Sequence, residues 1–138
     1  MTTGTARIID ANLNRLLEGL KVIEDIARLG LNSRNLLRSV RALRNRLGED
    51  TRDLRRRVLS ARDSEKDLGR GDRFDRLKRR NLSDVLVANF KRAQESSRVL
   101  EELLKVEDPA LSPKLKSVRF RLYDLEKKAM LDAEKELP

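Results

Sequence analysis

Residues 9–29 read IDANLNRLLEGLKVIEDIARL, and residues 86–106 read LVANFKRAQESSRVLEELLKV. Aligned without a gap, the two stretches share identical residues at 11/88, 12/89, 15/92, 18/95, 22/99 and 24/101. The spacing Ala-Asn-x-x-Arg-x-x-Glu therefore occurs twice, 77 positions apart. In both copies the apolar residues recur every three or four positions, which is the pattern of an amphipathic helix. A repeated helix of this kind predicts a fold built from two similar halves.

The first half reads as two helices. All three prolines lie at or beyond position 109, so no hard helix breaker occurs before it, and no useful stretch alternates with period two as a strand would. Gly30 is expected to end the first helix, and Asn32 or Ser33 to cap the second. Gly48 is expected to kink the second helix or to split it before DLRRRVL at 53–59.

The second half follows the same plan. The polar stretch SARDSEKDLGRGDR at 60–73 is expected to be the one long loop. A third helix is expected from about Ser83 to Val106. A fourth is expected to run to the C-terminus, with Ser112 as its cap and Pro113 at its first helical position.

We therefore predict an all-α protein, a four-helix bundle with one broken or extra short helix, in which all 138 residues form a single domain. The tripeptide SVR occurs at both 39–41 and 117–119, so the repeat extends faintly into the following helices. The two halves, about 5–60 and 82–135, are predicted to be related by an approximate two-fold rotation and joined by a loop at 60–81.

The composition limits the kinds of site that the chain can build. It has no cysteine and no histidine, which excludes disulfides, thiolate or imidazole metal ligands and Ser-His-Asp catalysis. Lysine and arginine number 32 against 23 acidic residues, and the net charge of +9 attracts anions such as nucleotides and phosphorylated metabolites. No apolar run approaches the roughly 20 residues of a membrane span, and no secretory signal is evident. We expect a cytoplasmic protein with no membrane partner.

The repeated polar residues lie close to the apolar side of each helix on a helical wheel. Asn12 and Arg15 are expected to point into the apolar arc, with Glu18 at its edge, and Asn89 and Arg92 are expected to do the same in the second copy. A buried guanidinium needs a partner, because burying it alone is costly. Two interpretations stay open: a satisfied polar network that fixes helix register, or two copies that line one anion-binding cleft.

Small residues and a charged loop favour the cleft. Gly19 and Ser96 follow the repeated glutamates and would leave room for a ligand. The loop segment ARDSEKDLG offers Arg62 for a phosphate, with Asp63 and Asp67 as hard oxygen ligands for magnesium. Taken alone, such a segment is typical of an ordinary charged surface loop.

Other nucleotide and nucleic-acid signals are weak. There is no GxxxxGK[ST] sequence, and GRG at 69–71 follows no strand. The basic runs at 52–57 and 73–80 could follow a nucleic-acid backbone. Their interleaved acids, and the lack of aromatic residues suited to stacking, favour a solvated helix face instead.

Four segments resemble one small bacterial family: RIIDANLNRLLEGLKVIEDIARL, ARDSEKDLG, VLVANFKRAQESSRVLEELLKV and RLYDLEK, in this order. It is the alternative hydroxymethylpyrimidine phosphate kinase family of thiamine biosynthesis, whose domain is also found fused ahead of thiamine-phosphate synthase. The resemblance extends from Arg7 to about Lys127, and its first block is the most specific part. In that family a histidine commonly follows the arginine of the second helix, whereas this chain has Arg44-Asn45.

The resemblance implies transfer of the γ-phosphoryl group of ATP, with Mg²⁺, to hydroxymethylpyrimidine monophosphate. The acceptor is already a phosphate, so no general base is needed and the missing histidine is no obstacle. It also implies ATP and the monophosphate as small-molecule partners. Association with thiamine-phosphate synthase and a homo-oligomer are compatible with it, and a nucleic-acid partner is disfavoured.

Under this hypothesis the inward-pointing residues and the loop divide into three roles. The arginines clamp phosphates, the amides and further cations bind substrate, and the carboxylates hold the metal or its waters. The candidates are Arg15, Arg92 and Arg62 as catalytic clamps, Asn12, Asn89, Lys91 and Arg7 for substrate or ATP, and Glu18, Glu95, Asp63 and Asp67 for magnesium.

Two other function classes stay open. One is a basic helical module that binds nucleic acid or protein without catalysis, and a steep salt dependence would identify a nucleic-acid backbone binder. The other is a helical enzyme similar to chorismate mutase, which would also clamp a dianion with arginines but would need neither ATP nor metal.

Overall fold

The structure is a computed structural model that describes residues 1–71 and 78–136, so the basic run predicted at 73–80 lies partly outside the described residues. Within the described ranges all regular secondary structure is helical, with five α-helices, one π-helical turn and no strand. The prediction of an all-α protein is confirmed. The helices are α1 (Thr3–Asp25), the π-helical turn η1 (Ile26–Gly30), α2 (Arg34–Asp50), α3 (Arg52–Leu59), α4 (Leu82–Glu107) and α5 (Ser112–Glu136).

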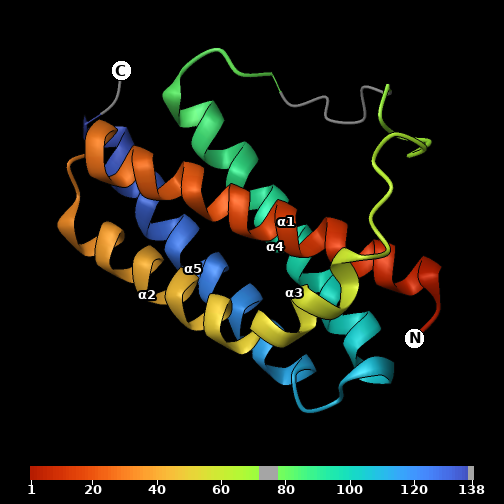
Figure 1. The fold of residues 1–138 in the computed structure, drawn as a ribbon. Coiled ribbons are helices and arrows are strands. Elements are labelled where there is room, and N and C mark those ends of the chain that lie inside the picture. Colours follow the sequence, from red (N-terminus) through yellow and green to blue (C-terminus); the bar gives the residue numbers. More distant parts are fainter. Residues whose placement is uncertain (72–77, 137–138) are drawn as a thin grey trace.

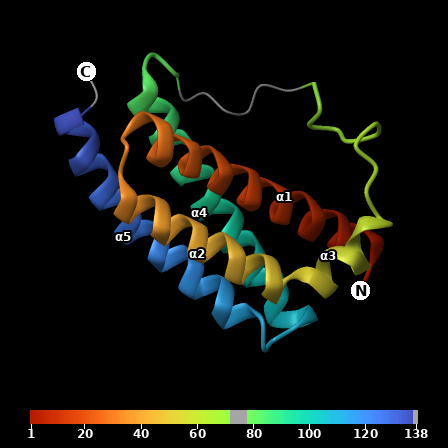
Figure 2. The same ribbon diagram turned by 60° about the vertical axis from the view of Figure 1, so that its left-hand side comes forward.

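The four long helices form a bundle around the pair α1 and α4, which pack against each other extensively (Figure 1). α5 lies against α4, and α2 and α3 lie against α1. α2 and α5 touch each other only sparsely, and both lie on the side of the bundle away from residues 60–71 (Figures 1 and 2). The α1–α4 pair therefore carries both copies of the repeated motif on one pair of neighbouring helices.

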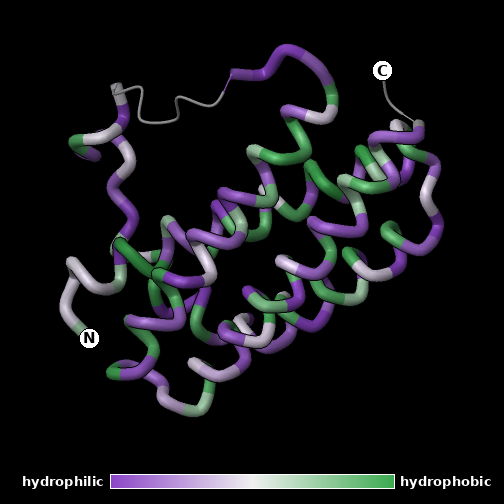
Figure 3. The backbone as a smooth tube through the Cα atoms, turned by 180° about the vertical axis from the view of Figure 1, so that it is seen from behind, coloured by the Kyte–Doolittle hydropathy of each residue, from purple (hydrophilic) through white to green (hydrophobic). Residues whose placement is uncertain are grey.

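Buried aliphatic side chains from all six helical elements form one continuous core. In Figure 3 hydrophobic positions recur along each helix between hydrophilic ones, as an amphipathic pattern requires. No helix in the described part of the chain is long and apolar enough to cross a membrane.

The first helical connection follows the sequence closely. α1 runs on into η1, which ends at Gly30 as predicted, and Leu31 N–H donates to the carbonyl of Ile26 at 2.8 Å. The residue with positive φ is Asn32, at 51°, and not the glycine. Ser33 caps α2, because its hydroxyl accepts the N–H of Leu36, which confirms one of the two predicted caps.

Two predicted helix boundaries need correction. The predicted split before 53–59 is confirmed, but α2 runs through Gly48 and the break lies at Thr51. Thr51 is fully buried and donates its hydroxyl to the carbonyl of Leu47 at 2.7 Å. The carbonyl of Leu47 thus accepts both the N–H and the hydroxyl of Thr51, an arrangement that often bends helices. Ser112 is not a cap either: its hydroxyl donates to the carbonyl of Glu101 at 2.8 Å and so ties the start of α5 to α4.

Candidate functional site

The two motif copies meet where α1 packs on α4. A Cβ placed on Gly19 would lie 3.3 Å from the carbonyl oxygen of Asn89 and 3.6 Å from the Cβ of Ala93. Gly19 and Ser96 are both buried, so the expectation that they leave room for a ligand is wrong. The glycine instead permits close approach of the two backbones, which brings the motif turns of α1 and α4 together.

The repeated asparagines make matching bonds. Asn12 Nδ2 donates to the carbonyl of Ile8 at 2.9 Å, and Asn89 Nδ2 donates to the carbonyl of Val85 at 2.8 Å. Asn12 is buried and Asn89 is half-buried, as their places on the wheel predict. In the described part of the chain neither side-chain oxygen receives a hydrogen bond, so both keep an acceptor for another partner.

Arg15 and Arg92 lie on the exposed surfaces of α1 and α4. The prediction that they point into the apolar arc is wrong: both side chains are exposed, so their guanidinium groups keep their hydration. Neither makes a hydrogen bond or ion pair with any residue that the structure describes. Arg15 lies one turn before Gly19, and Arg92 lies in the turn of α4 that Gly19 contacts. Both arginines therefore border the same helix contact with their donors free for an anion.

A third arginine reaches α1 from the connection that follows α3. Arg62 donates from Nε and Nη2 to the two carboxylate oxygens of Asp10, both at 2.7 Å. The side chain of Asp10 is 9% exposed, whereas that of Arg62 stays 45% exposed. The hydrogen bonds to Asp10, and the charges of Asp10 and Glu18, raise the pKa of the Arg62 guanidinium. Asp10 thus positions Arg62 against α1 while part of the arginine faces solvent.

Sequence reasoning did not identify Asp10, because its partner lies 52 positions later in the chain. The available signal was a carboxylate at the border of the apolar stripe, which needs a cation when it is buried. Arg7 also joins α1 to this connection, since its Nη2 donates to the carbonyl of Asp63 at 3.5 Å. Lys91 is exposed on α4 and has no polar partner within the described residues.

The four predicted magnesium ligands do not form one cluster. Glu18 and Glu95 are exposed on α1 and α4. Asp63 and Asp67 each accept a backbone N–H within their own loop. Among the described residues, no group of three or more acidic side chains is arranged to hold a metal ion. A metal bound here would need oxygens from its substrate, and the role of each carboxylate stays a prediction.

Two buried glutamates tie the central helices to the outer ones. Glu24 accepts from Arg41 at 3.1 Å and from Arg44 at 2.6 Å, both from α2. Glu101 accepts from Arg119 of α5 at 3.0 Å. Glu24 and Glu101 match in the repeat, and Arg41 and Arg119 end the two SVR tripeptides. Matching residues therefore make matching ion pairs, a role that the sequence comparison had not assigned to them.

The chain matches the ThiD2 family over residues 7–128. Similar curated proteins are named thiamine-phosphate synthase. The one from Synechococcus sp. (strain CC9605) is 43% identical over 122 residues, which cover 88% of this chain and 34% of that protein. Those from Synechocystis sp. and Gloeobacter violaceus are 39% and 41% identical over 125 and 124 residues, which cover 90% and 89% of this chain and 36% of each protein.

The chain spans about a third of the length of these curated relatives. No solved structure is significantly similar to it. The family match begins in α1 at Arg7 and ends in α5 at Lys128, and on this basis the chain belongs to the ThiD2 family.

Proposed function

We propose that this chain is a kinase of thiamine biosynthesis, which transfers the γ-phosphoryl group of ATP to hydroxymethylpyrimidine monophosphate. Membership of the ThiD2 family and the similarity to proteins named thiamine-phosphate synthase support the pathway. The observation that carries the reaction is the pair Arg15 and Arg92, exposed and without described partners at one contact between α1 and α4. Arg62, held on α1 by Asp10, adds a third guanidinium.

The proposed reaction suits a site made of cations. A phosphate oxygen of the acceptor attacks the γ-phosphorus of ATP, and the bond from that phosphorus to the bridging oxygen breaks, releasing ADP. Since the attacking oxygen already carries negative charge, no side chain has to remove a proton. The protein has to hold two anions in line and stabilise the charge of the transition state. Arg15 and Arg92 are the proposed clamps from the two central helices, and Arg62 is the proposed clamp from the connection.

Magnesium fits the acidic residues of the same helices. It is usually held by one or two carboxylates together with substrate phosphates, not by a cage of protein ligands. Glu18 and Glu95 each follow a motif arginine by three residues and are exposed, so they are the proposed carboxylates. When bound, the metal would neutralise part of the phosphate charge.

The remaining candidates are proposed to bind and orient the substrates. The free oxygens of Asn12 and Asn89 can accept from an aminopyrimidine or a hydroxyl group. Lys91 and Arg7 add positive charge on α4 and α1. Because the relatives are about three times longer, association with a thiamine-phosphate synthase partner is proposed as well. A homo-oligomer is compatible with the same site.

A coupled assay tests the proposal. The chain is mixed with ATP, Mg²⁺ and hydroxymethylpyrimidine monophosphate; ADP release is followed, and ³¹P NMR identifies the product. We expect one molecule of hydroxymethylpyrimidine diphosphate for each molecule of ADP formed. ADP release at the same rate without acceptor, or no release at all by folded protein, would overturn the proposed function.

A further inference from the structure

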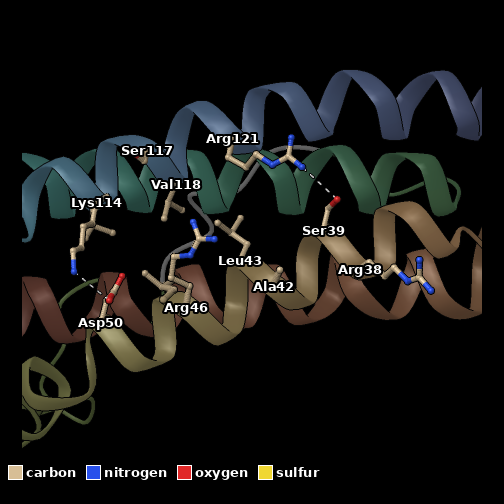
Figure 4. A pocket seen from close by; sticks show the side chains of 12 residues that line it. Arg38, Ser39, Ala42, Leu43, Arg46, Asp50, Lys114, Ser117, Val118 and Arg121 are labelled. Carbon is tan, nitrogen blue, oxygen red and sulfur yellow. Dashed lines mark hydrogen bonds and ion pairs between the residues drawn. The ribbon is translucent and has the colours of Figure 1, made fainter.

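A hollow between α2 and α5 lies apart from the candidate site. Its volume is about 690 Å³, a size common among small-molecule pockets, and every residue that lines it belongs to α2 or α5 (Figure 4). Aliphatic side chains line it from both helices, namely Leu43 and Leu47 on α2 and Leu115 and Val118 on α5. These four side chains form a buried apolar floor, at most 7% exposed, and the exposed methyl group of Ala42 adds to it.

Cations surround this apolar surface without matching acids. Arg46 of α2 lies between the two helices, and Arg121 of α5 extends toward Ser39 (Figure 4). Arg121 donates only to the hydroxyl of Ser39, at 3.3 Å, and Arg46 has no polar partner within the described residues. The one lining carboxylate, Asp50, is paired with Lys114 at 3.3 Å. Arg38 also lines the hollow and has no partner among the described residues, so three guanidinium groups there are neutralised by no carboxylate.

Polar contacts join α2 and α5 at two levels of the hollow. The Asp50–Lys114 pair and the Ser39–Arg121 hydrogen bond are eleven residues apart on α2, or about 16 Å along a helix. A partner helix laid along the groove would have to displace both contacts. A second copy of the same face would place like charges against each other. The space between the two contacts therefore fits a short anionic ligand better than it fits a partner helix or a second copy of the chain.

We propose that this hollow is a second anion site, which binds an organic monophosphate with an apolar body. The phosphate lies between Arg46 and Arg121, since guanidinium groups donate pairs of hydrogen bonds to phosphate oxygens. The body covers Ala42 and the part of the apolar floor that is open to solvent. The ligand is not the reacting substrate of the proposed kinase, because neither Arg15 nor Arg92 lines the hollow.

Phenyl phosphate is a suitable probe, with inorganic phosphate and phenol as its two separate halves. Titrations followed by ¹⁵N NMR locate each probe on the chain. We expect saturable shifts for phenyl phosphate at the amides of Ser39, Ala42 and Ser117, which line the hollow. Inorganic phosphate and phenol are expected to bind at least about tenfold more weakly, because each lacks one of the two contacts.

Three variants separate the hollow from general surface charge. Arg46→Gln and Arg121→Gln are each expected to weaken phenyl phosphate binding at least about tenfold. Arg34→Gln makes the same charge change on exposed α2 surface outside the hollow and should leave binding unchanged. If Arg121→Gln loses its fold by circular dichroism, Arg46→Gln decides, since Arg46 has no described polar contact to lose.

Several results would overturn the proposal: no saturable binding, shifts confined to α1 and α4, equal binding of inorganic phosphate, or equal weakening by Arg34→Gln. Sedimentation velocity, which measures whether the chain dimerises, can give one further result that would overturn the proposal. A dimer whose formation shifts the lining amides would show that a second copy, and not a phosphate ester, covers the hollow.

Discussion

Asp10 holds the connection after α3 against α1, through its paired hydrogen bonds with Arg62. Asp10→Asn keeps the size of the side chain but removes the charge, so Arg62 can no longer be held by a bidentate ion pair. We expect kcat/KM of the proposed kinase reaction to fall roughly 10–100-fold, which corresponds to losing one charge-assisted contact. Steady-state kinetics with purified variants measures this effect.

Asp124→Asn is the matched control, because Asp124 is exposed on α5 and lies outside the candidate site. Its kinetics should equal those of the unmodified chain. If Asp10→Asn also stays fully active while Arg62→Ala does not, Arg62 acts without being positioned by Asp10.

The arginines of the motif show what a helical wheel can predict at this scale. A wheel gives the direction of each Cβ, and for the short Asn12 that direction places the whole side chain in the helix contact. Arg15 starts near the same side, but its long aliphatic stem carries the guanidinium out to solvent. The residue types of the candidate site come from the sequence alone, and their part in the chemistry stays a prediction. The exposure of the long side chains and the partner of Asp10 depend on packing between distant segments.

Within the helices, Gly19 and Gly48 face different surroundings. A Cβ on Gly48 would meet nothing within 4 Å, whereas on Gly19 it would lie 3.3 Å from the carbonyl oxygen of Asn89. Gly48→Ala should raise the free energy of unfolding by about 0.5–1 kcal/mol, because alanine loses less backbone entropy in a helix. Gly19→Ala should lack this gain, and Gly19→Val should destabilise by about 1–3 kcal/mol through overpacking. Urea denaturation measures all three, and equal gains for both alanines would contradict the close α1–α4 contact.

The ion pairs of Glu24 make the α1–α2 contact sensitive to acid. Burial favours the neutral carboxyl, but the hydrogen bond from Lys21 and the contacts with Arg44 and Arg41 outweigh it, so the pKa of Glu24 lies below its ordinary value of 4.5. Such a carboxylate stabilises the fold above the pKa that it has in the unfolded chain. This stabilisation is lost as the pH falls through the lower pKa of the folded state.

We therefore expect Glu24→Gln to destabilise the chain by about 1–3 kcal/mol at pH 7. The effect should begin to shrink as the pH falls below 4.5 and should be lost only below the lower pKa of the folded state, where the carboxyl of the unmodified chain is neutral as well. Urea denaturation of both proteins, at pH 7 and again well below pH 4.5, measures this change in the free energy of unfolding. Glu49→Gln, an exposed substitution on α2, is the control and should have little effect at either pH. A difference that does not change with pH would mean that Glu24 stabilises through shape and not through charge.

Helix boundaries divide into those set locally and those set by packing. Ser33 caps α2 through a bond to the N–H of Leu36, three residues away, and such local chemistry is readable from sequence. The break between α2 and α3 lies at Thr51, which is buried and bonds back to Leu47, and this burial cannot be read locally. Ser112 has the composition of a cap, but its hydroxyl is used by the carbonyl of Glu101, eleven residues earlier.

For the whole molecule, the proposed site predicts which acceptor is used. Arginines that bind the phosphate of the acceptor cannot make the same contacts with hydroxymethylpyrimidine, because this free alcohol has no phosphate group. A bidentate contact between arginine and phosphate is worth on the order of 2–3 kcal/mol, or roughly 30–150-fold in kcat/KM. Free hydroxymethylpyrimidine should therefore be a poorer acceptor than its monophosphate by about this factor. Equal turnover of the two compounds in the coupled assay would show that the acceptor phosphate is not bound by these arginines.

The two halves of the molecule are predicted to serve one site with unequal roles. Arg15 and Arg92 border the same α1–α4 contact, but the donor and the acceptor are different molecules, so perfect symmetry would serve neither. The residues beside the motif differ accordingly: Asn14 and Leu17 of α1 correspond to Lys91 and Gln94 of α4. We expect Arg15→Ala and Arg92→Ala each to lower turnover at least about 100-fold, a loss of about 2.7 kcal/mol of transition-state stabilisation. One variant should mainly raise the KM for ATP and the other the KM for the acceptor. Because both arginines are exposed, circular dichroism should show unchanged folding, and folded variants with near-normal rates would assign the repeat to helix packing alone.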